Sequence, residues 1–226
     1  MEIDVSKPIL EKNELLAAEN RKSFRDAGVF VVDLMASPGA GKTSTILATI
    51  DALRDRYRIA VIEGDIASKV DADKVKAHGI PAVQINTGGA CHLESDMIQR
   101  AAAVLPMDDL DLIIVENVGN LVCPTEFDLG EDAKVMILSV PEGHDKPYKY
   151  PAIFSRAEAI ILNKYDTLSV FDFDEAEFRD VVGKLNGKAP IFPISATKGD
   201  GVSAWTDWLA ARIDEAKAKA AARSGS

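Results

Sequence analysis

Short apolar runs rich in Val, Ile and Leu alternate along the chain with longer stretches whose apolar residues recur at helical spacing. This alternation is typical of an α/β fold in which a mainly parallel sheet carries helices on both faces. The apolar runs predict strands at 28–35, 58–63, 82–86, 110–116, 133–140, 158–163 and 190–194. The stretches between them predict helices at 42–55, 69–78, 93–105, 147–156, 172–186 and 201–222.

The same pattern indicates the domain organisation, because no Gly/Ser-rich linker or internal repeat divides the chain. We therefore expect residues 28–222 to form one domain. Residues 6–27 are polar and amphipathic, and they predict a helix that packs on this domain or on a partner. We expect this helix to make up an N-terminal helical extension over residues 1–27. The chain has 226 residues, 47% of them hydrophobic, which is enough to bury a continuous core.

The charge of the chain narrows the choice of partners. The formal net charge is −10 and the isoelectric point is about 4.8, so we expect neither a nucleic acid nor an anionic membrane as the main partner. The first residues contain no basic region followed by an apolar core, and no segment approaches the roughly 18 apolar residues of a membrane span. We therefore expect a cytoplasmic protein. The chain has 2 cysteines, which argues against a disulfide framework.

Residues 35–44, with the sequence MASPGAGKTS, follow the first predicted strand. Backbone N–H groups and the positive end of the next helix converge in such a loop, so that it holds phosphate groups. The phosphate-loop pattern G-x-x-x-x-G-K-[ST] is matched everywhere except at its first position. Ala36 stands there, and its Cβ requires a φ that Ala tolerates. The residues expected to bind nucleotide are Ser37, Pro38, Gly39, Ala40, Gly41, Lys42, Thr43 and Ser44.

A second motif, NKYD at residues 163–166, follows the apolar run 159–162. The carboxylate of Asp166 would accept hydrogen bonds from guanine N1–H and N2–H₂, which adenine does not present on that edge, so the motif favours GTP over ATP. Alone, these four letters are more often a turn at the end of a strand. The stretch SATKG at 195–199 strengthens the interpretation, because it resembles the last guanine loop of GTPases. The residues expected to bind nucleotide here are Asn163, Lys164, Asp166, Ser195, Ala196 and Thr197. The resemblance to GTPases implies that Lys164 lies along the base, that Asn163 ties loops together and that the N–H of Ala196 meets the guanine oxygen.

Acidic residues at the ends of two predicted strands indicate a Mg²⁺ site, which phosphoryl transfer requires. Glu116 ends one strand, and Asp65 lies just past another, so both acids reach the carboxyl edge of the sheet. Thr43 is expected to bind Mg²⁺ directly, with Asp65 and Glu116 as further magnesium residues. The N–H of Gly119 is placed to reach the γ-phosphate. We expect Lys42, Asp65 and Glu116 to be catalytic, although either acid could instead be a helix cap or a solvated loop charge.

The two cysteines and one histidine offer a different kind of site. Cys91 and His92 are neighbours between a predicted strand and helix, and Cys123 lies just past Glu116. Two thiolates and an imidazole suit Zn²⁺ or Ni²⁺, with a fourth position left for water or a second subunit. By residue type alone, such cysteines are more often small buried apolar groups. The position of Cys123 argues for a metal, because its segment is expected to move with the γ-phosphate.

Several motifs together resemble the HypB family, the GTPases that help insert nickel into [NiFe]-hydrogenase: SPGAGKT, EGDI, TGGACHL, ENVGNLVCP, PEGHDKPYKYP, NKYD and SATKGDG. The resemblance implies a SIMIBI-type P-loop GTPase that binds GTP and GDP and forms a homodimer when GTP is bound. It implies a nickel or zinc site of Cys91, His92 and Cys123 shared across the dimer. A HypA-type nickel chaperone and the hydrogenase large subunit are the implied partners. Lys146 is implied to contact nucleotide from the opposite subunit, unless it is a solvated loop residue.

The same motifs are compatible with three other classes of protein. Urease-type nickel GTPases of the UreG family carry a Cys-x-His arrangement, whereas Cys91 and His92 are adjacent here, which favours the HypB family. A GTP-dependent protein switch with no metal cargo would use both cysteines structurally. A small-molecule kinase built on the same phosphate loop would need an acceptor site and would have no reason to prefer guanine.

Overall fold

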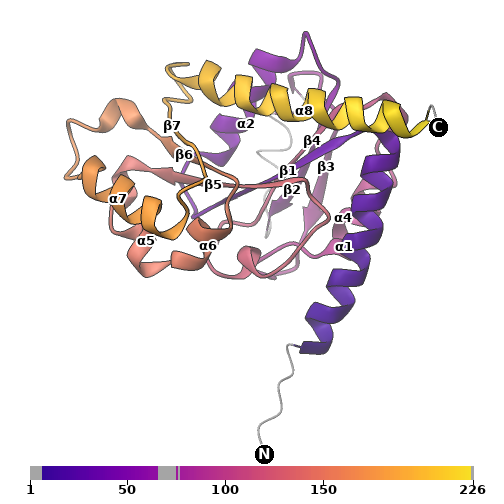
Figure 1. Cartoon of the computed structure of the whole chain (residues 1–226), viewed down its shortest axis with the longest axis horizontal. Helices are drawn as coiled ribbons and strands as arrows, with labels where there is room; N and C mark the ends of the chain where they lie inside the picture. The colour runs from indigo at the N-terminus through magenta and orange to yellow at the C-terminus, as the bar shows by residue number, and fades with distance from the viewer. Residues whose placement is uncertain (1–6, 66–74, 76, 225–226) are drawn as a thin grey trace, which may run out of the picture.

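The computed structural model describes residues 7–65, 75 and 77–224, and these form a seven-stranded sheet with helices on both faces (Figure 1). The strand order is β3-β2-β4-β1-β5-β6-β7, and every neighbouring pair is parallel. The strands are β1 (Phe30–Ala36), β2 (Ile59–Asp65), β3 (Ala82–Asn86), β4 (Leu112–Glu116), β5 (Ala133–Ser139), β6 (Ala159–Asn163) and β7 (Ile191–Pro193). The predicted α/β class with a parallel sheet is thereby confirmed.

The helices described are α1 (Lys7–Ala27), α2 (Lys42–Leu53), α4 (Ser95–Ala102), α5 (Lys146–Lys149), α6 (Pro151–Arg156), α7 (Glu175–Leu185) and α8 (Val202–Ser224). Short 3₁₀ turns lie at η1 (Met107–Asp109), η2 (Cys123–Thr125), η3 (Val140–Glu142) and η4 (Tyr165–Thr167). All strand ranges expected from the apolar runs are confirmed to within a few residues. The helix predicted at 69–78 falls mostly outside the described residues.

The single helix predicted over 147–156 is wrong. The chain forms two short helices, α5 and α6, which meet at Tyr150 with φ −131° and ψ 56°. Pro151 begins α6, and a proline disfavours the helical conformation of the residue before it. The break therefore follows from one local steric clash that the helical spacing of apolar residues does not reveal.

One face of the sheet is covered by α2 and α8. Alternate strand residues such as Val32, Leu34 and Ile114 point to this face and are almost fully buried. On α8, Trp205 packs into the same core and donates its indole N–H to Thr49 Oγ1 of α2 at 2.9 Å. The last helix is thus anchored to the helix that follows the phosphate loop.

The opposite face is covered in two halves, by α1 and α4 over the β2 and β4 side and by α6 and α7 over the β5 and β6 side. Phe24 of α1 is buried in the core on this face. Asn20 donates from its amide to the carbonyls of Ser95 (2.8 Å) and Leu129 (3.1 Å). The amphipathic helix predicted near the N-terminus therefore packs on the domain. Within the part of the chain that the structure describes, no helix is long and apolar enough to cross a bilayer.

The parallel arrangement brings the carboxyl ends of β1, β4, β5 and β6 to a single edge of the sheet. Ligand sites of open α/β sheets lie at this edge, because the loops that leave the strands gather there. The phosphate loop leaves β1, and the segment after Glu116 leaves β4. The loop with the NKYD motif leaves β6. Motifs far apart in the chain are thereby placed around one point.

Candidate functional site

The phosphate loop spans residues 37–41 between β1 and α2. Gly39 has φ 79° and Gly41 has φ 95°, a left-handed conformation that suits glycine. Ala36 ends β1 and pairs with Ile137 of β5 in extended backbone, so its Cβ causes no strain. The N-cap residue of α2 is Gly41, which has no side chain to cap the helix, so the first N–H groups of α2 are available to bind a phosphate. Lys42 is the first residue of α2, next to Gly41 of the phosphate loop, and it is half-buried.

The NKYD motif contacts the phosphate loop directly. Asn163 is 2% exposed, donates its amide to Ala40 O at 2.9 Å and accepts from the N–H of Ala196 at 3.2 Å. A Cβ on Gly41 would lie 2.4 Å from the Asn163 amide nitrogen, so this approach requires glycine. Lys164 donates its ammonium to Gly39 O at 2.7 Å. One asparagine therefore joins the phosphate loop to the loop at 195–199.

Asp166 lies on the rim of this site and forms an ion pair with Lys198 at 2.9 Å. The Lys198 ammonium lowers the pKa of the Asp166 carboxyl, which keeps it an acceptor at neutral pH. Ser195 is buried and its N–H bonds to Asp200 O at 2.9 Å, while Thr197 is exposed. The carboxylate predicted to read guanine is thus positioned by a lysine that the sequence interpretation did not assign.

Two of the three residues predicted to bind magnesium, Thr43 and Glu116, meet next to the phosphate loop. Thr43 Oγ1, on the first turn of α2, lies 3.2 Å and 3.5 Å from the two carboxylate oxygens of Glu116. A hydroxyl beside a carboxylate is an oxygen donor set that suits Mg²⁺. Asp65 ends β2 one strand away, but its side chain lies outside what the structure describes. A Cβ on Gly119 would lie 3.0 Å from Pro38 Cγ, so the segment after β4 packs against the phosphate loop.

Glu142 is a residue of this site that the sequence interpretation missed. It caps η3 by accepting from the N–H of Ser139 at 2.8 Å and from its hydroxyl at 2.7 Å. Its other carboxylate oxygen is hydrogen-bonded to the hydroxyl of Ser37 in the phosphate loop. The spacing Ser-x-x-Glu is the signal that could have revealed it. Lys146, predicted to contact nucleotide from the opposite subunit, begins α5 and lies 5.6 Å from the Tyr150 ring centroid.

Cys91, His92 and Cys123, which we call the thiol–imidazole cluster, come together from two loops. Their ligand atoms all lie within 4.8 Å of one another. Cys91 Sγ lies 3.0 Å from Cys123 Sγ and 3.6 Å from His92 Nδ1. Donation of the Cys123 thiol proton to the Cys91 sulfur, together with partial burial, raises the pKa of Cys123, and a metal ion would replace that proton. The donor set and spacing fit Ni²⁺ or Zn²⁺.

The surroundings orient the thiol–imidazole cluster. The His92 ring stacks on Phe127 with 3.8 Å between centroids, and burial lowers the pKa of His92. The neutral imidazole is the form that binds metal. Asn120 donates its amide to Cys91 O at 3.3 Å, which ties the loop after β3 to the loop after β4. These contacts hold the three side chains near one another without a metal ion.

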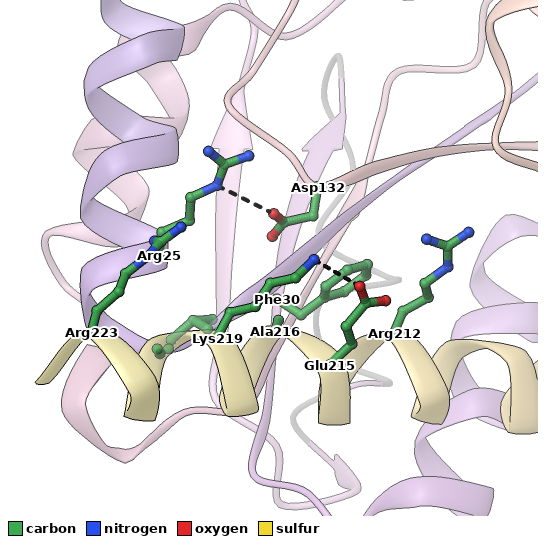
Figure 2. A pocket seen from close by; sticks show the side chains of 11 residues that line it. Arg25, Phe30, Asp132, Arg212, Glu215, Ala216, Lys219 and Arg223 are labelled. Atoms are coloured by element: carbon green, nitrogen blue, oxygen red, sulfur yellow. Dashed lines mark hydrogen bonds and ion pairs between the residues drawn. The ribbon is translucent and has the colours of Figure 1, made fainter. Parts of the chain in front are cut away.

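A cavity at the other end of β1 is unrelated to these motifs. Figure 2 shows it between the C-terminal part of α1, the start of β1 and α8. Arg25 pairs with Asp132 at 4.0 Å, and Lys219 pairs with Glu215 at 2.7 Å. None of the predicted site residues lines this cavity, so it is separate from the candidate nucleotide site.

The parallel sheet, the loop between β1 and α2 and the asparagine that ties this loop to β6 define a P-loop nucleotide-binding protein. The family model described as "CobW/HypB/UreG, nucleotide-binding domain" matches residues 30–193. The chain is 45% identical over 207 residues to hydrogenase maturation factor HypB of Escherichia coli strain K12, covering 92% of this chain and 71% of that protein. It is 46% identical over 228 residues to HypB of Azotobacter vinelandii, covering 96% and 75%. The chain belongs to the HypB family.

Solved structures agree with this assignment. A crystal structure of HypB from Helicobacter pylori in complex with nickel has a TM-score of 0.86 and 38% identity, covering 90% of this chain and 96% of that one. HypB from Archaeoglobus fulgidus has a TM-score of 0.84 and 36% identity, covering 90% and 99%. A LAO/AO transport system kinase, at 16% identity and a TM-score of 0.52, shares the fold alone. The SIMIBI-type fold expected from the sequence is confirmed.

Proposed function

We propose that this protein is a GTP-hydrolysing metallochaperone that binds nickel, or zinc, and assists nickel insertion into [NiFe]-hydrogenase. The observation that carries the proposal is the thiol–imidazole cluster, whose ligand atoms lie within 4.8 Å of one another. Cys123 lies on the segment that leaves β4, and Gly119 of the same segment packs against Pro38 of the phosphate loop. The relatives described as hydrogenase maturation factors and the nickel complex of the Helicobacter pylori protein support it.

The nucleotide is GTP, bound with its phosphates on the loop at 37–41 and its base at the NKYD motif. Asp166 accepts from the guanine edge. The N–H of Ala196 is donated to Asn163 Oδ1 in this structure, so it reaches the guanine oxygen only by sharing or releasing that bond. Asn163 holds Ala40 and Ala196 at a fixed separation, because it bonds to both backbones. The contacts within 37–41 and 163–198 support one continuous site for base and phosphates.

Hydrolysis to GDP and phosphate depends on Lys42, Thr43 and the acids at the strand ends. Lys42 counters the charge of the β- and γ-phosphates. Thr43, Glu116 and Asp65 would hold Mg²⁺, which when bound neutralises charge that develops on the phosphate oxygens. Gly119 offers its N–H towards the γ-phosphate. None of the described residues is assigned as a water-orienting glutamine, so turnover by the protein alone is slow and serves as a timer for metal release.

The proposed partners follow from the site and the family. The protein forms a homodimer when GTP is bound, and the second subunit supplies the ligand that completes the metal site. Lys146 contacts the nucleotide of the opposite subunit. The metal passes by way of a HypA-type chaperone to the hydrogenase large subunit in the cytoplasm, without nucleic acid or membrane. One relative, from Helicobacter hepaticus, is described as a hydrogenase/urease maturation factor HypB, so urease is the alternative recipient.

The test is sedimentation mass combined with bound metal. The protein is measured with GDP and with a non-hydrolysable GTP analogue plus Mg²⁺, each with and without Ni²⁺. We expect a dimer with the analogue only, and stoichiometric Ni²⁺ that is lost in Cys91→Ala. The substitution Ser155→Ala, at an exposed position on α6, is the matched control and keeps both properties. Metal affinity unchanged in Cys91→Ala would show that the thiol–imidazole cluster does not hold the metal and would refute the proposed metallochaperone role.

A further inference from the structure

A network of buried charged and polar side chains connects the two halves of the candidate site. Asp33 stands in the middle of β1 with no exposed surface, although its neighbours along the strand are apolar. Lys134 of β5 reaches it, with its ammonium 3.2 Å from Asp33 Oδ2. Asn117, the residue after β4, donates its amide to both Asp33 oxygens at 3.1 Å and 3.2 Å. We call Asp33, Asn117 and Lys134 the buried triad.

Lys134 connects the buried triad to the loop that carries Cys123. Its ammonium donates to Phe127 O at 2.9 Å, lies 3.5 Å from Pro124 O and pairs with Glu131 at 2.8 Å. Pro124 follows Cys123 in the chain, and the Phe127 ring stacks on His92. Burial alone would lower the pKa of Lys134, but the charges of Asp33 and Glu131 outweigh it and raise the pKa, so the ammonium stays charged.

Asn117 connects the rest of the buried triad to the loop that carries Cys91 and His92, and it lies close in sequence to a residue that packs on the phosphate loop. Its amide oxygen accepts from the N–H of Leu93 at 3.3 Å and from its neighbour Val118 at 2.9 Å. Leu93 follows His92, and it packs on Gly64, where a Cβ would lie 2.8 Å from the Leu93 side chain. Asn117 also lies two residues before Gly119, which packs on the phosphate loop. Both polar ends of one amide are therefore in use.

We propose that the buried triad couples the nucleotide state of the phosphate loop to the geometry of the thiol–imidazole cluster. This inference rests on the proposed function and adds the residues that carry the coupling. A γ-phosphate that draws Gly119 inward shifts Asn117, whose amide cannot turn without breaking its bonds to Asp33 or Leu93. Such a fully bonded network moves between discrete arrangements because a half-satisfied one is costly when buried. Leu93 and Lys134 then move the backbones beside His92 and Cys123.

The experiment measures Ni²⁺ affinity through the thiolate-to-nickel charge-transfer absorbance, with GDP and with a non-hydrolysable GTP analogue plus Mg²⁺. The quantity of interest is the ratio of the two affinities. We expect a ratio clearly different from one in the wild type. In Lys134→Met the ratio should move at least halfway, on a logarithmic scale, towards one, while Ni²⁺ affinity with GDP changes by less than about threefold. If the buried triad were merely structural, Lys134→Met would lower the Ni²⁺ affinity equally with GDP and with the GTP analogue, and the ratio of the two affinities would stay unchanged.

A second variant guards against misfolding. Lys134→Met leaves two buried carboxylates, those of Asp33 and Glu131, without their lysine. Asp33→Asn combined with Lys134→Met removes the Asp33–Lys134 ion pair as a unit and leaves only Glu131 without its lysine, which is the milder change. Asp111→Asn is the matched control, because Asp111 is a buried acid bonded to Arg58 before β4, at the other end of that strand from Asn117. It should keep the wild-type ratio.

The outcomes separate this inference from the function on which it rests. A wild-type ratio retained in the folded double variant overturns the coupling role of the buried triad. So does a wild type that binds Ni²⁺ equally in both nucleotide states, which would leave the metal site intact. A wild type that binds no stoichiometric Ni²⁺ in either state would instead overturn the proposed metallochaperone function itself.

Discussion

Truncation of Asn163 is the sharpest test of how the nucleotide site is assembled. Its amide nitrogen donates to Ala40 O at 2.9 Å, and its amide oxygen accepts from Ala196 N at 3.2 Å. Ala40 has no exposed surface, and Asn163 itself is 2% exposed. In Asn163→Ala both backbone groups lose their partner in a place that water reaches poorly. The substitution therefore removes the connection between the phosphate loop and the loop at 195–199 without changing a residue of either loop.

The magnitude follows from these two bonds. Leaving a buried polar group without a partner costs about 1–3 kcal/mol, and the Ala196 N–H is only half-buried, so its cost lies near the lower end. We expect a loss of about 2–4 kcal/mol in the free energy of unfolding. Because the two loops are no longer held at one separation, GTP affinity should fall by about tenfold to a hundredfold, equivalent to about 1.4–2.8 kcal/mol.

Urea unfolding and a fluorescent-nucleotide titration measure the two quantities. Asn186→Ala is the matched control, because the Asn186 amide also donates to backbone carbonyls, those of Phe154 at 3.0 Å and Ala157 at 2.7 Å. It should lower stability while GTP affinity at temperatures well below unfolding stays within about threefold of wild type. Wild-type GTP affinity in folded Asn163→Ala would refute the reasoning that this amide sets the distance between the loops.

Three further predictions concern base choice, acid stability and metal dependence. In Asp166→Asn, preference should shift from GTP towards xanthosine triphosphate, because an amide donates to the altered base edge; competition titration measures this, and unchanged GTP preference contradicts it. At Asp111, burial alone would raise the pKa, but bonds from Arg58 lower it to about 2 from 3.8, so its stabilisation is complete above about pH 4 and is lost as pH falls towards 2. Asp111→Asn should therefore lower the free energy of unfolding by about 1–2 kcal/mol at pH 7 and by much less at pH 2 in urea titrations, and an equal loss at both values would contradict this. GTP turnover should depend on Mg²⁺ and fall at least about tenfold in Glu116→Gln, as phosphate release would show; hydrolysis that survives complete chelation would exclude the proposed role.

The predictable part of the site consists of features that a short stretch of sequence contains. The phosphate loop was predictable despite Ala36, since strand, glycines, lysine and threonine follow one another and β1 accommodates Ala36 in extended backbone. Cys91, His92 and Cys123 were grouped because Cys123 follows Glu116 and because the motifs around them resemble the HypB family, whereas residue type alone favoured buried apolar cysteines. Their approach to within 4.8 Å depends on β2 lying between β3 and β4, which no local pattern states.

The residues that sequence interpretation missed act across long separations. Glu142 meets Ser37 over 105 positions, and Lys134 meets Asp33 over 101. A lone charge inside an apolar strand, such as Asp33 in FVVDLMA, is the available signal for a buried pair, but it does not name the partner. The partner is set by the register of β1 with β5, which places Asp33 beside Lys134.

The amino-acid sequence by itself determined the order of strands and helices, the phosphate loop and the guanine motif. These features depend on hydrophobic period and on neighbouring residues, which act within a few turns of chain. Only the tertiary structure decided that Asn163 joins Ala40 to Ala196, that Lys198 pairs with Asp166 and that Asn117 accepts from the N–H of Leu93, the residue after His92. Contacts between such residues are set by strand order and register, because the packing of the whole sheet brings together residues that are remote along the chain.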